Sequence, residues 1–261
     1  MYAKSEALKA LFIFIGEIDS AISIASLRAD LTIKKCTPTI TSQQKELSAI
    51  NVYHPLIENC ITNSIDIHGK SVFITGSNMS GKSTFLRTIL INDILAKTIY
   101  TCFADKYLTT LNQPFSSIKI GDNLSEGKSY YFEEVSVMHQ MVNQVINNNQ
   151  NIFIIDEIFK GTNTVERISL AKAVLEYLNT TDNIIIASSH DLELIDLLHN
   201  DFEMYYFTET INGNQLFFDH KIKKGTLPTR NARKIIEIEG FPSSLVSDAY
   251  LTSSLIKSYH I

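Results

Sequence analysis

The eight residues from Gly76 to Ser83, Gly-Ser-Asn-Met-Ser-Gly-Lys-Ser, constrain the fold of this chain more than any other feature of its sequence. They match the pattern G-x-x-x-x-G-K-[S/T] at every fixed position, and a chance match in a chain of 261 residues arises roughly once in a hundred sequences. An apolar run, 71–75, precedes them, and a helical pattern over 82–99 follows. A strand that passes through a glycine-rich turn into a helix predicts a phosphate-binding loop.

The chemistry expected of this loop follows from its backbone. The glycines allow consecutive N–H groups to face one anion, and the next helix directs the positive end of its dipole to the same place. Lys82 is expected to reach the β- and γ-phosphates, and the Ser83 hydroxyl to bind Mg²⁺. We therefore predict ATP and Mg²⁺ as cofactors, and a binding loop made of Gly76, Ser77, Asn78, Met79, Ser80, Gly81, Lys82, Ser83 and Thr84. The alternative is a glycine-rich turn that binds nothing.

A pair of carboxylates is expected at the end of another strand. The apolar run 152–155 ends in Asp156 and Glu157, a weak signal alone but a strong one beside a phosphate loop. Asp156 is expected to hold Mg²⁺, and Glu157 to orient or deprotonate the attacking water. His190 follows the next apolar run, 183–187, where it either senses the γ-phosphate or caps the strand end, and spacing alone does not choose. The predicted catalytic residues are Glu157, Lys82 and His190.

Apolar strands alternate with helical patterns through the rest of the chain, which predicts an α/β fold. The helical patterns cover 131–146, 166–178, 191–198 and, in the tail, 229–261. We expect a mainly parallel sheet with helices on both faces, because continuous apolar strands are typical of sheets buried on both sides. The runs 204–208 and 215–218 flank Asn212-Gly213 and predict a β-hairpin, an antiparallel element that extends the sheet.

The N-terminal segment has a different pattern. Apolar side chains at helical spacing predict a helix over residues 4–31, and the polar stretch 37–44 predicts a linker or exposed loop. The apolar run 10–15 is much shorter than the roughly 18 residues that a membrane-spanning helix needs, and Glu17 and Asp19 follow it. We therefore expect no membrane segment.

Charge and cysteine content narrow the class of protein. Lys and Arg number 23 against 28 Asp and Glu, a net charge of −5, which disfavours a stand-alone nucleic-acid binder but leaves room for a local basic patch. The cysteines Cys36, Cys60 and Cys102 lie far apart and form no C-x-x-C pair, so structural zinc and a disulfide framework are both disfavoured. Unpaired cysteines indicate a reducing, cytoplasmic compartment.

Taken together, these segments resemble the MutS family. Residues 75–84, TGSNMSGKST, are similar to its phosphate loop TGPNMGGKST, with serine in place of the proline and of the second glycine. Residues 156–164, DEIFKGTNT, resemble the family's DEIGRGTST block, and Ser188-Ser-His190 resembles its ATH switch. The resemblance covers roughly residues 50–200 in the family's order. It implies a P-loop NTPase of the ABC type that hydrolyses ATP.

The resemblance also implies a dimer. Residues 122–129, DNLSEGKS, are similar to the family's signature segment DDLASGRS, which completes the active site of the other subunit in ABC-type ATPases. Ser129 is then expected to contact the γ-phosphate in trans, and Asn163 to lie in a loop that crosses the dimer. The expected partners are a second copy of the chain and DNA, the latter through domains outside this chain. We divide it into a helical segment, 1–45, which resembles the end of a lever domain, and an ATPase domain, 46–261.

Four functions compete at this stage. The first is an ATP-driven dimeric clamp that acts on DNA in mismatch repair, and the second is a nucleotide-gated dimerisation module with little turnover. The Asp156-Glu157 pair argues against the second. A transporter ATPase would carry an LSGGQ-like signature and a glutamine loop, and neither is found. A small-molecule kinase would need a lid with several arginines between the two motifs, whereas residues 84–155 contain a single arginine, Arg87.

Overall fold

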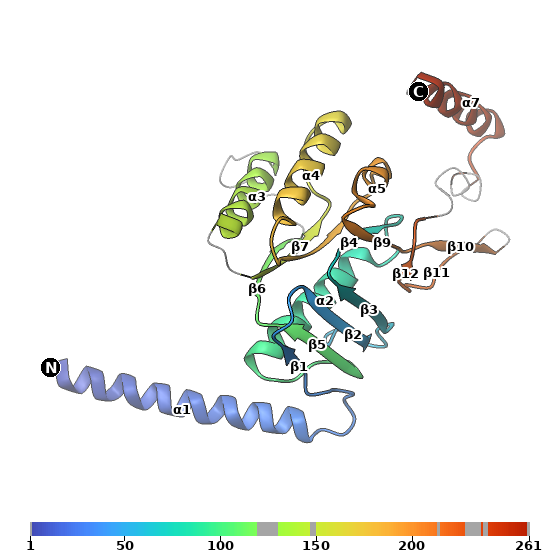
Figure 1. The fold of residues 1–261 in the computed structure, drawn as a ribbon. Coiled ribbons are helices and arrows are strands. Elements are labelled where there is room, and N and C mark those ends of the chain that lie inside the picture. The colour runs from blue at the N-terminus through green and yellow to red at the C-terminus, as the bar shows by residue number, and fades with distance from the viewer. Residues whose placement is uncertain are drawn as a thin grey trace.

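The computed structural model describes residues 2–118, 130–146, 150–212, 215–227, 236 and 240–259 and builds them around two β-sheets (Figure 1). The helices are α1 (Tyr2–Ala29), α2 (Lys82–Thr98), α3 (Tyr130–Ile146), α4 (Thr164–Leu178), α5 (Glu193–Leu198) and α7 (Ser243–Tyr259). The larger sheet contains β4 (Ser71–Thr75), β6 (Gln113–Ser117), β7 (Asn151–Asp156), β8 (Ile184–Ser188), β9 (Phe202–Tyr206) and β12 (Lys223–Lys224). The smaller contains β1 (Thr39–Thr41), β2 (Glu46–Val52), β3 (Asn63–His68) and β5 (Lys106–Thr110).

The larger sheet confirms the predicted α/β fold. Its strand order is β12-β9-β4-β8-β7-β6. The strands from β9 to β6 all pair in parallel, and β12 alone pairs antiparallel, with β9 at the edge. The carboxyl ends of β4, β7 and β8 therefore meet at one edge of the sheet, which is where ligands bind in folds of this kind.

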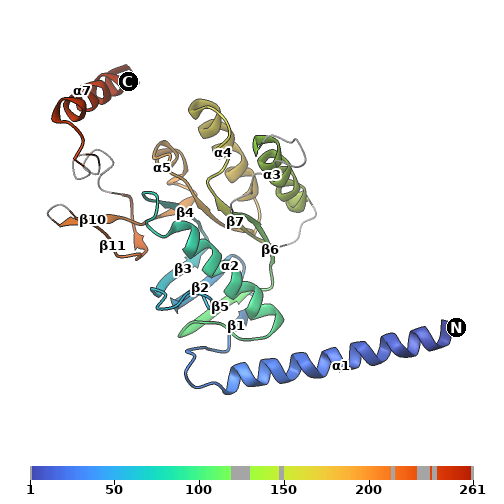
Figure 2. The ribbon, with the colours of Figure 1, turned by 180° about the vertical axis from the view of Figure 1, so that it is seen from behind.

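Helices cover both faces of the larger sheet, and the alternation of side chains along its strands decides which face each residue joins (Figures 1 and 2). On β4, Val72 and Ile74 point to a core shared with α2 and the smaller sheet, whereas Phe73 points to a core shared with α3, α4 and α5. All three side chains are fully buried. Helix α2 consequently lies between the two sheets, with its first turn at the end of β4.

The smaller sheet was not anticipated by the sequence analysis. Its order is β1-β5-β2-β3, with β1 parallel to β5 and the other pairs antiparallel. The stretch 37–44 was expected to be a linker or exposed loop, which is wrong at its centre because Thr39–Thr41 forms β1. Its partner strand β5 begins more than sixty residues later, so no local pattern reveals the pairing.

The predicted hairpin forms with a different first strand. Strand β10 (Glu209–Asn212), not residues 204–208, pairs antiparallel with β11 (Gln215–Phe218), and the two make a separate two-stranded sheet. The apolar residues that suggested a hairpin strand lie largely in β9, a parallel strand of the larger sheet. The expected antiparallel extension of the larger sheet is supplied instead by β12.

Helix α1 projects away from both sheets (Figures 1 and 2). Its apolar side chains are exposed: Leu8, Phe12 and Ile22 expose 56%, 73% and 62% of their surface. Residues 5–29 are long and apolar enough to cross a membrane, contrary to our expectation, which counted only uninterrupted apolar runs. Signal sequences and core helices of soluble proteins share this length and composition, so the feature alone does not place the chain in a membrane.

The last turn of α1 is attached to the end of α2. The guanidinium of Arg28 donates hydrogen bonds to the carbonyl oxygen of Ile99 at 2.6 Å and to the hydroxyl of Thr101 at 3.0 Å. A little further along, Cys36 and Cys102 exchange two backbone hydrogen bonds of 2.8 and 2.9 Å. The rest of α1 has a different environment, because residues 5–23 are all exposed to solvent.

Candidate nucleotide site

The loop between β4 and α2 has the backbone that a phosphate-binding loop requires. Gly76 has a φ of 149°, and a Cβ at this position would lie 2.6 Å from the carbonyl oxygen of Phe207. Only glycine fits there, because the obstructing atom belongs to the backbone of a neighbouring segment. Gly81 and Met79 also have positive φ values, of 117° and 67°. The loop therefore reverses direction just before the first turn of α2, as predicted.

Lys82 lies inside this loop. Its ammonium group donates hydrogen bonds of 2.8 Å to the carbonyl oxygens of Gly76 and Ser77, and only 5% of the residue is exposed. Burial lowers the pKa of Lys82 to about 8, although the carboxylates of Glu157, Asp156 and Glu209 act in the opposite direction. A cation held against the loop in this way is placed to meet a phosphate group.

The remaining loop side chains are fixed from several directions. The Ser77 hydroxyl donates a 2.5 Å hydrogen bond to Glu209, and the buried Ser80 hydroxyl donates one of 2.8 Å to the carbonyl oxygen of Ser77. Asn78 and Met79 are exposed at the tip of the loop. Ser83 and Thr84 open α2, with Ser83 half-buried and Thr84 exposed.

The carboxylate pair lies at the adjacent strand end. Asp156 is the last residue of β7, opposite Ser188 of β8, whose hydroxyl donates a 2.5 Å hydrogen bond to the Asp156 carboxylate. Glu157 follows with a φ of 56°, a left-handed conformation that is unusual for a residue with a side chain. Its backbone N–H donates to the carbonyl oxygen of Ser188 at 3.0 Å, which ties the residue to the end of β8.

Two side chains hold the Glu157 carboxylate. His190 Nε2 lies 2.5 Å from one carboxylate oxygen and Lys160 Nζ lies 2.6 Å from the other. The hydrogen bond from His190 is the main reason that the pKa of Glu157 falls to about 2, with Lys160 adding to the effect and burial opposing it. In this structure the carboxylate is ionised near neutral pH and already paired.

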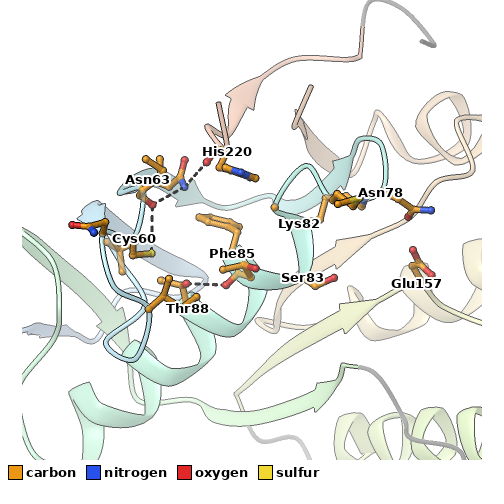
Figure 3. Close-up of a pocket in the computed structure, with 16 residues that line it drawn as sticks. Cys60, Asn63, Asn78, Lys82, Ser83, Phe85, Thr88, Glu157 and His220 are labelled. Carbon is orange, nitrogen blue, oxygen red and sulfur yellow. Dashed lines mark hydrogen bonds between the residues drawn. The ribbon is translucent and has the colours of Figure 1, made fainter. Parts of the chain in front are cut away.

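A pocket of about 370 Å³ opens beside the phosphate loop (Figure 3). Of the predicted site residues, its lining includes Asn78, Met79, Gly81, Lys82, Ser83, Thr84 and Glu157. Figure 3 shows Asn78, Lys82 and Glu157 at one end and Cys60, Asn63 and His220 at the other. This volume falls within the range of small-molecule sites. The two ends of the pocket carry different kinds of side chain.

The second end of the pocket was missed by the sequence analysis. His220 lies just after β11, and its Nδ1 is 3.1 Å from the carbonyl oxygen of Ser80, so the ring is fixed against the phosphate loop. Asn63 donates a 3.0 Å hydrogen bond to the carbonyl oxygen of His220 and holds that segment in place. The only local signal was the predicted hairpin, which returns the chain toward the loop after residue 212.

The structure does not place the two predicted dimer-contact residues, Asn163 and Ser129, at the pocket. The Asn163 side chain caps the N-terminus of α4, where its oxygen accepts a 3.0 Å hydrogen bond from the N–H of Glu166. Ser129, with the whole signature segment 122–129, falls outside the described residues. His190 reaches the site through Glu157. The assigned roles of all these residues stay predictions.

Comparison with known proteins decides the family. Residues 72–257, more than half of the chain, match MutS domain V. The chain belongs to the MutS domain V family. MutS domain V is an ATPase domain with a P-loop fold of the ABC type, so this member is an ATP-binding ATPase domain with that fold. The match begins within β4 and therefore includes both the phosphate loop and the carboxylate pair.

Several curated proteins are similar to this MutS-family chain. It is 30% identical over 246 residues to the DNA mismatch repair protein MutS of Petrotoga mobilis, a segment that covers 89% of this chain. It is 28% identical over 250 residues to the protein of the same name from Chlamydia muridarum, and 29% identical over 250 residues to that from Leptospira interrogans. The chain spans only 29–30% of the length of these relatives.

Proposed function

We propose that this MutS-family chain hydrolyses ATP with Mg²⁺ in sites completed by a second copy, and that hydrolysis resets a dimeric clamp that acts on DNA in mismatch repair. One observation carries the proposal: Lys82, buried in the phosphate loop, and Glu157, an ionised carboxylate, line the same pocket. A phosphate-binding cation and a water-orienting carboxylate are the two parts that γ-phosphate hydrolysis requires.

The donor set beside the loop suits Mg²⁺. Ser83 offers a hydroxyl and Asp156 a carboxylate, both oxygen ligands, and Mg²⁺ commonly takes one or two such protein ligands with phosphate and water oxygens. Among the described residues, no group of three or more His, Cys, Asp or Glu side chains could hold a metal by itself, so the nucleotide would have to supply ligands. When bound, Mg²⁺ supplies charge neutralisation at the β- and γ-phosphates.

The chain's own residues then divide the work of hydrolysis. The loop N–H groups and Lys82 bind the phosphates and neutralise charge that develops as the bond to the leaving ADP breaks. Glu157 accepts a hydrogen bond from the attacking water and orients it in line with that bond. For this to happen the Glu157 carboxylate must exchange at least one of its present partners, Lys160 or His190, for the water.

The second end of the pocket is proposed to hold the adenine base. His220 presents an aromatic ring, which stacks on Phe218 with a centroid separation of 6.0 Å, and Ile61 adds an apolar surface opposite the polar Asn63. An aromatic ring and apolar side chains suit the faces of a base, and amide groups suit its edge. This placement would leave the triphosphate at the end that contains Lys82.

The wider assembly is also part of the proposal. A second copy would supply Ser129 to the γ-phosphate and bring Asn163 near the dimer interface, while residues 1–45 would form a helical segment whose last part, β1, joins the smaller sheet of the ATPase domain, 46–261. DNA would be bound by parts that the longer MutS relatives have outside the matched segment. The unpaired cysteines Cys36, Cys60 and Cys102 suit a reducing cytoplasm.

The test is ATP hydrolysis measured against protein concentration for the wild type and Ser129→Ala. Specific activity that rises with concentration and falls in Ser129→Ala supports sites completed in trans. Flat activity that does not respond to Ser129→Ala means a self-sufficient monomer site, and the dimer part of the proposal is then wrong. Absence of hydrolysis at every concentration, with ATP still bound, overturns the enzymatic part for this chain.

One observation favours a second candidate, a nucleotide-gated dimerisation module with little turnover. The Glu157 carboxylate is already bound by both His190 and Lys160, so it is not directed at a water in this conformation. If both contacts to the Glu157 carboxylate persist with ATP bound, the chain would bind nucleotide and change its assembly without hydrolysis. Dimer formation driven by ATP, with a turnover no faster than that of Glu157→Gln, would support this candidate.

A further inference from the structure

We propose that Glu134 of α3 is a positioning residue for hydrolysis, because it holds the segment 157–161 that carries Glu157. We name this segment the base loop. The inference rests on the proposed function, since it concerns the placement of the water-orienting carboxylate. Glu134 has no part in the sequence motifs discussed above.

The contact between Glu134 and the base loop uses both carboxylate oxygens. Oε1 accepts a hydrogen bond from the backbone N–H of Lys160 at 3.2 Å, and Oε2 accepts one from that of Gly161 at 3.1 Å. Glu134 is only 4% exposed. Hydrogen bonds between an ionised carboxylate and backbone N–H groups are stronger than neutral ones, and in a buried position water does not replace them.

The base loop has a conformation that needs such support. Both Glu157 and Phe159 have a φ of 56°, in the left-handed region, and each such residue costs on the order of 1–3 kcal/mol. Conformations of this kind persist only where the surrounding structure holds them. On the strand side the holding contact is the bond from the Glu157 N–H to Ser188, and on the helix side it is Glu134.

The first turn of α3 also packs closely on the end of the base loop. A Cβ on Gly161 would lie 2.9 Å from the Cβ of Tyr131, a separation that real atoms do not adopt. The rings of Tyr131 and Phe159 lie 6.4 Å apart. A shift of α3 along or across this contact must therefore move the base loop, with Glu134 pulling on its backbone and Tyr131 limiting its approach.

Through this contact the position of α3 affects the position of Glu157. Helix α3 begins at Tyr130, immediately after the segment 122–129 that is proposed to meet the nucleotide of the second copy. A displacement of α3 would therefore change the position of the base loop, and with it that of the Glu157 carboxylate.

The test compares Glu134→Ala and Glu134→Gln with the control Glu133→Gln, which removes a charge from the same helical turn. We expect kcat to fall at least about tenfold in Glu134→Ala and less in Glu134→Gln, which keeps one acceptor oxygen, while KM for ATP stays within about twofold. Glu133→Gln should match the wild type. A merely structural role would instead lower ATP affinity and kcat together and would not be rescued by Gln.

Hydrogen exchange separates this inference from the proposed function, because it needs no activity. In Glu134→Ala without nucleotide, the amides of Lys160 and Gly161 should exchange at least about tenfold faster than in the wild type, whereas those of β7 should not change. Unchanged exchange at these amides overturns the inference even if the wild type hydrolyses ATP. If these amides exchange faster in Glu134→Ala but the wild type does not hydrolyse ATP, the contact between Glu134 and the base loop is confirmed and its role in hydrolysis is overturned.

Discussion

The phosphate loop and the base loop lie at adjacent strand ends of one sheet, yet they are held in different ways. The phosphate loop takes its shape mainly from backbone requirements at Gly76 and Gly81 and from Lys82 bonded to loop carbonyl oxygens, and Glu209 and His220 add contacts from other segments. The base loop has no glycine at its two left-handed positions, Glu157 and Phe159, and depends on side chains from elsewhere.

We expect from this difference that nucleotide binding and turnover have separate physical supports. A loop defined by its own backbone keeps its shape when neighbouring helices move, so nucleotide binding is expected to be insensitive to assembly. A loop held by ion pairs and by Glu134 changes when those contacts change, so turnover is expected to respond to partners.

Glu157→Gln should lower hydrolysis by about a hundredfold or more while ATP binding stays close to that of the wild type, since the carboxylate orients water and does not hold phosphate. Single-turnover kinetics and binding of a non-hydrolysable ATP analogue would measure the two effects. Glu176→Gln, on the exposed face of α4, is the control. Loss of ATP binding in Glu157→Gln would contradict the idea that binding and turnover depend on different loops.

Gly76→Ala should destabilise the fold by about 3 kcal/mol and abolish ATP binding, because the new Cβ would lie 2.6 Å from the Phe207 carbonyl oxygen. Gly69→Ala is a matched control: its φ is also positive, at 76°, but no atom lies within 4 Å of the added Cβ. It should cost only about 1 kcal/mol. Urea unfolding of both variants measures the costs, and equal values would contradict the close approach at Gly76.

ATP affinity should fall as pH rises above about 8. Burial lowers the pKa of Lys82 to about 8, so the free protein loses the lysine proton there, while the phosphates bind the charged form. The loss should approach tenfold per pH unit well above this value. Calorimetric titration with ATP at pH 7 to 9.5 would show it, with Lys82→Arg as the control that stays charged. A flat profile in the wild type would mean that Lys82 stays protonated in the free protein.

Asn163→Ala should have the smallest effect, about 1 kcal/mol of stability, because it removes the N-cap of α4. Asn163→Asp keeps an oxygen acceptor and should restore stability. If Asn163 also contacts nucleotide across the dimer, hydrolysis stays reduced in Asn163→Asp even though the cap is restored. Full activity in the Asp variant would mean that Asn163 acts only as the N-cap of α4.

Most of what a local pattern can encode was predicted correctly. The strand, loop and helix around Lys82 follow from residues next to one another, and the parallel sheet follows from apolar runs at β4, β7 and β8. The MutS resemblance, carried by the same segments, was confirmed at the level of the family. The individual roles of the site residues stay predictions.

The parts that were missed depend on contacts between distant segments. His220 meets Ser80 across 140 residues and Glu134 meets Lys160 across 26, and neither lies in a motif. The smaller sheet pairs strands from three separate stretches, so its short strands appear as loops in the sequence. Residues 204–208 were wrongly assigned to the hairpin. A short apolar run can form either an edge strand of a hairpin or a buried strand of a parallel sheet, and the sequence pattern does not distinguish the two.

The attachment of α1 to α2 through Arg28 has a mechanical consequence. Helix α2 begins with Lys82 of the phosphate loop and ends next to Ile99, whose carbonyl oxygen accepts a hydrogen bond from Arg28, so it connects that loop to an arm. The arm is α1, whose 28 residues extend about 42 Å. A one-degree rotation at its fixed end displaces its tip by about 0.7 Å. We therefore expect a small rotation of α2 to produce a larger displacement at the far end of α1.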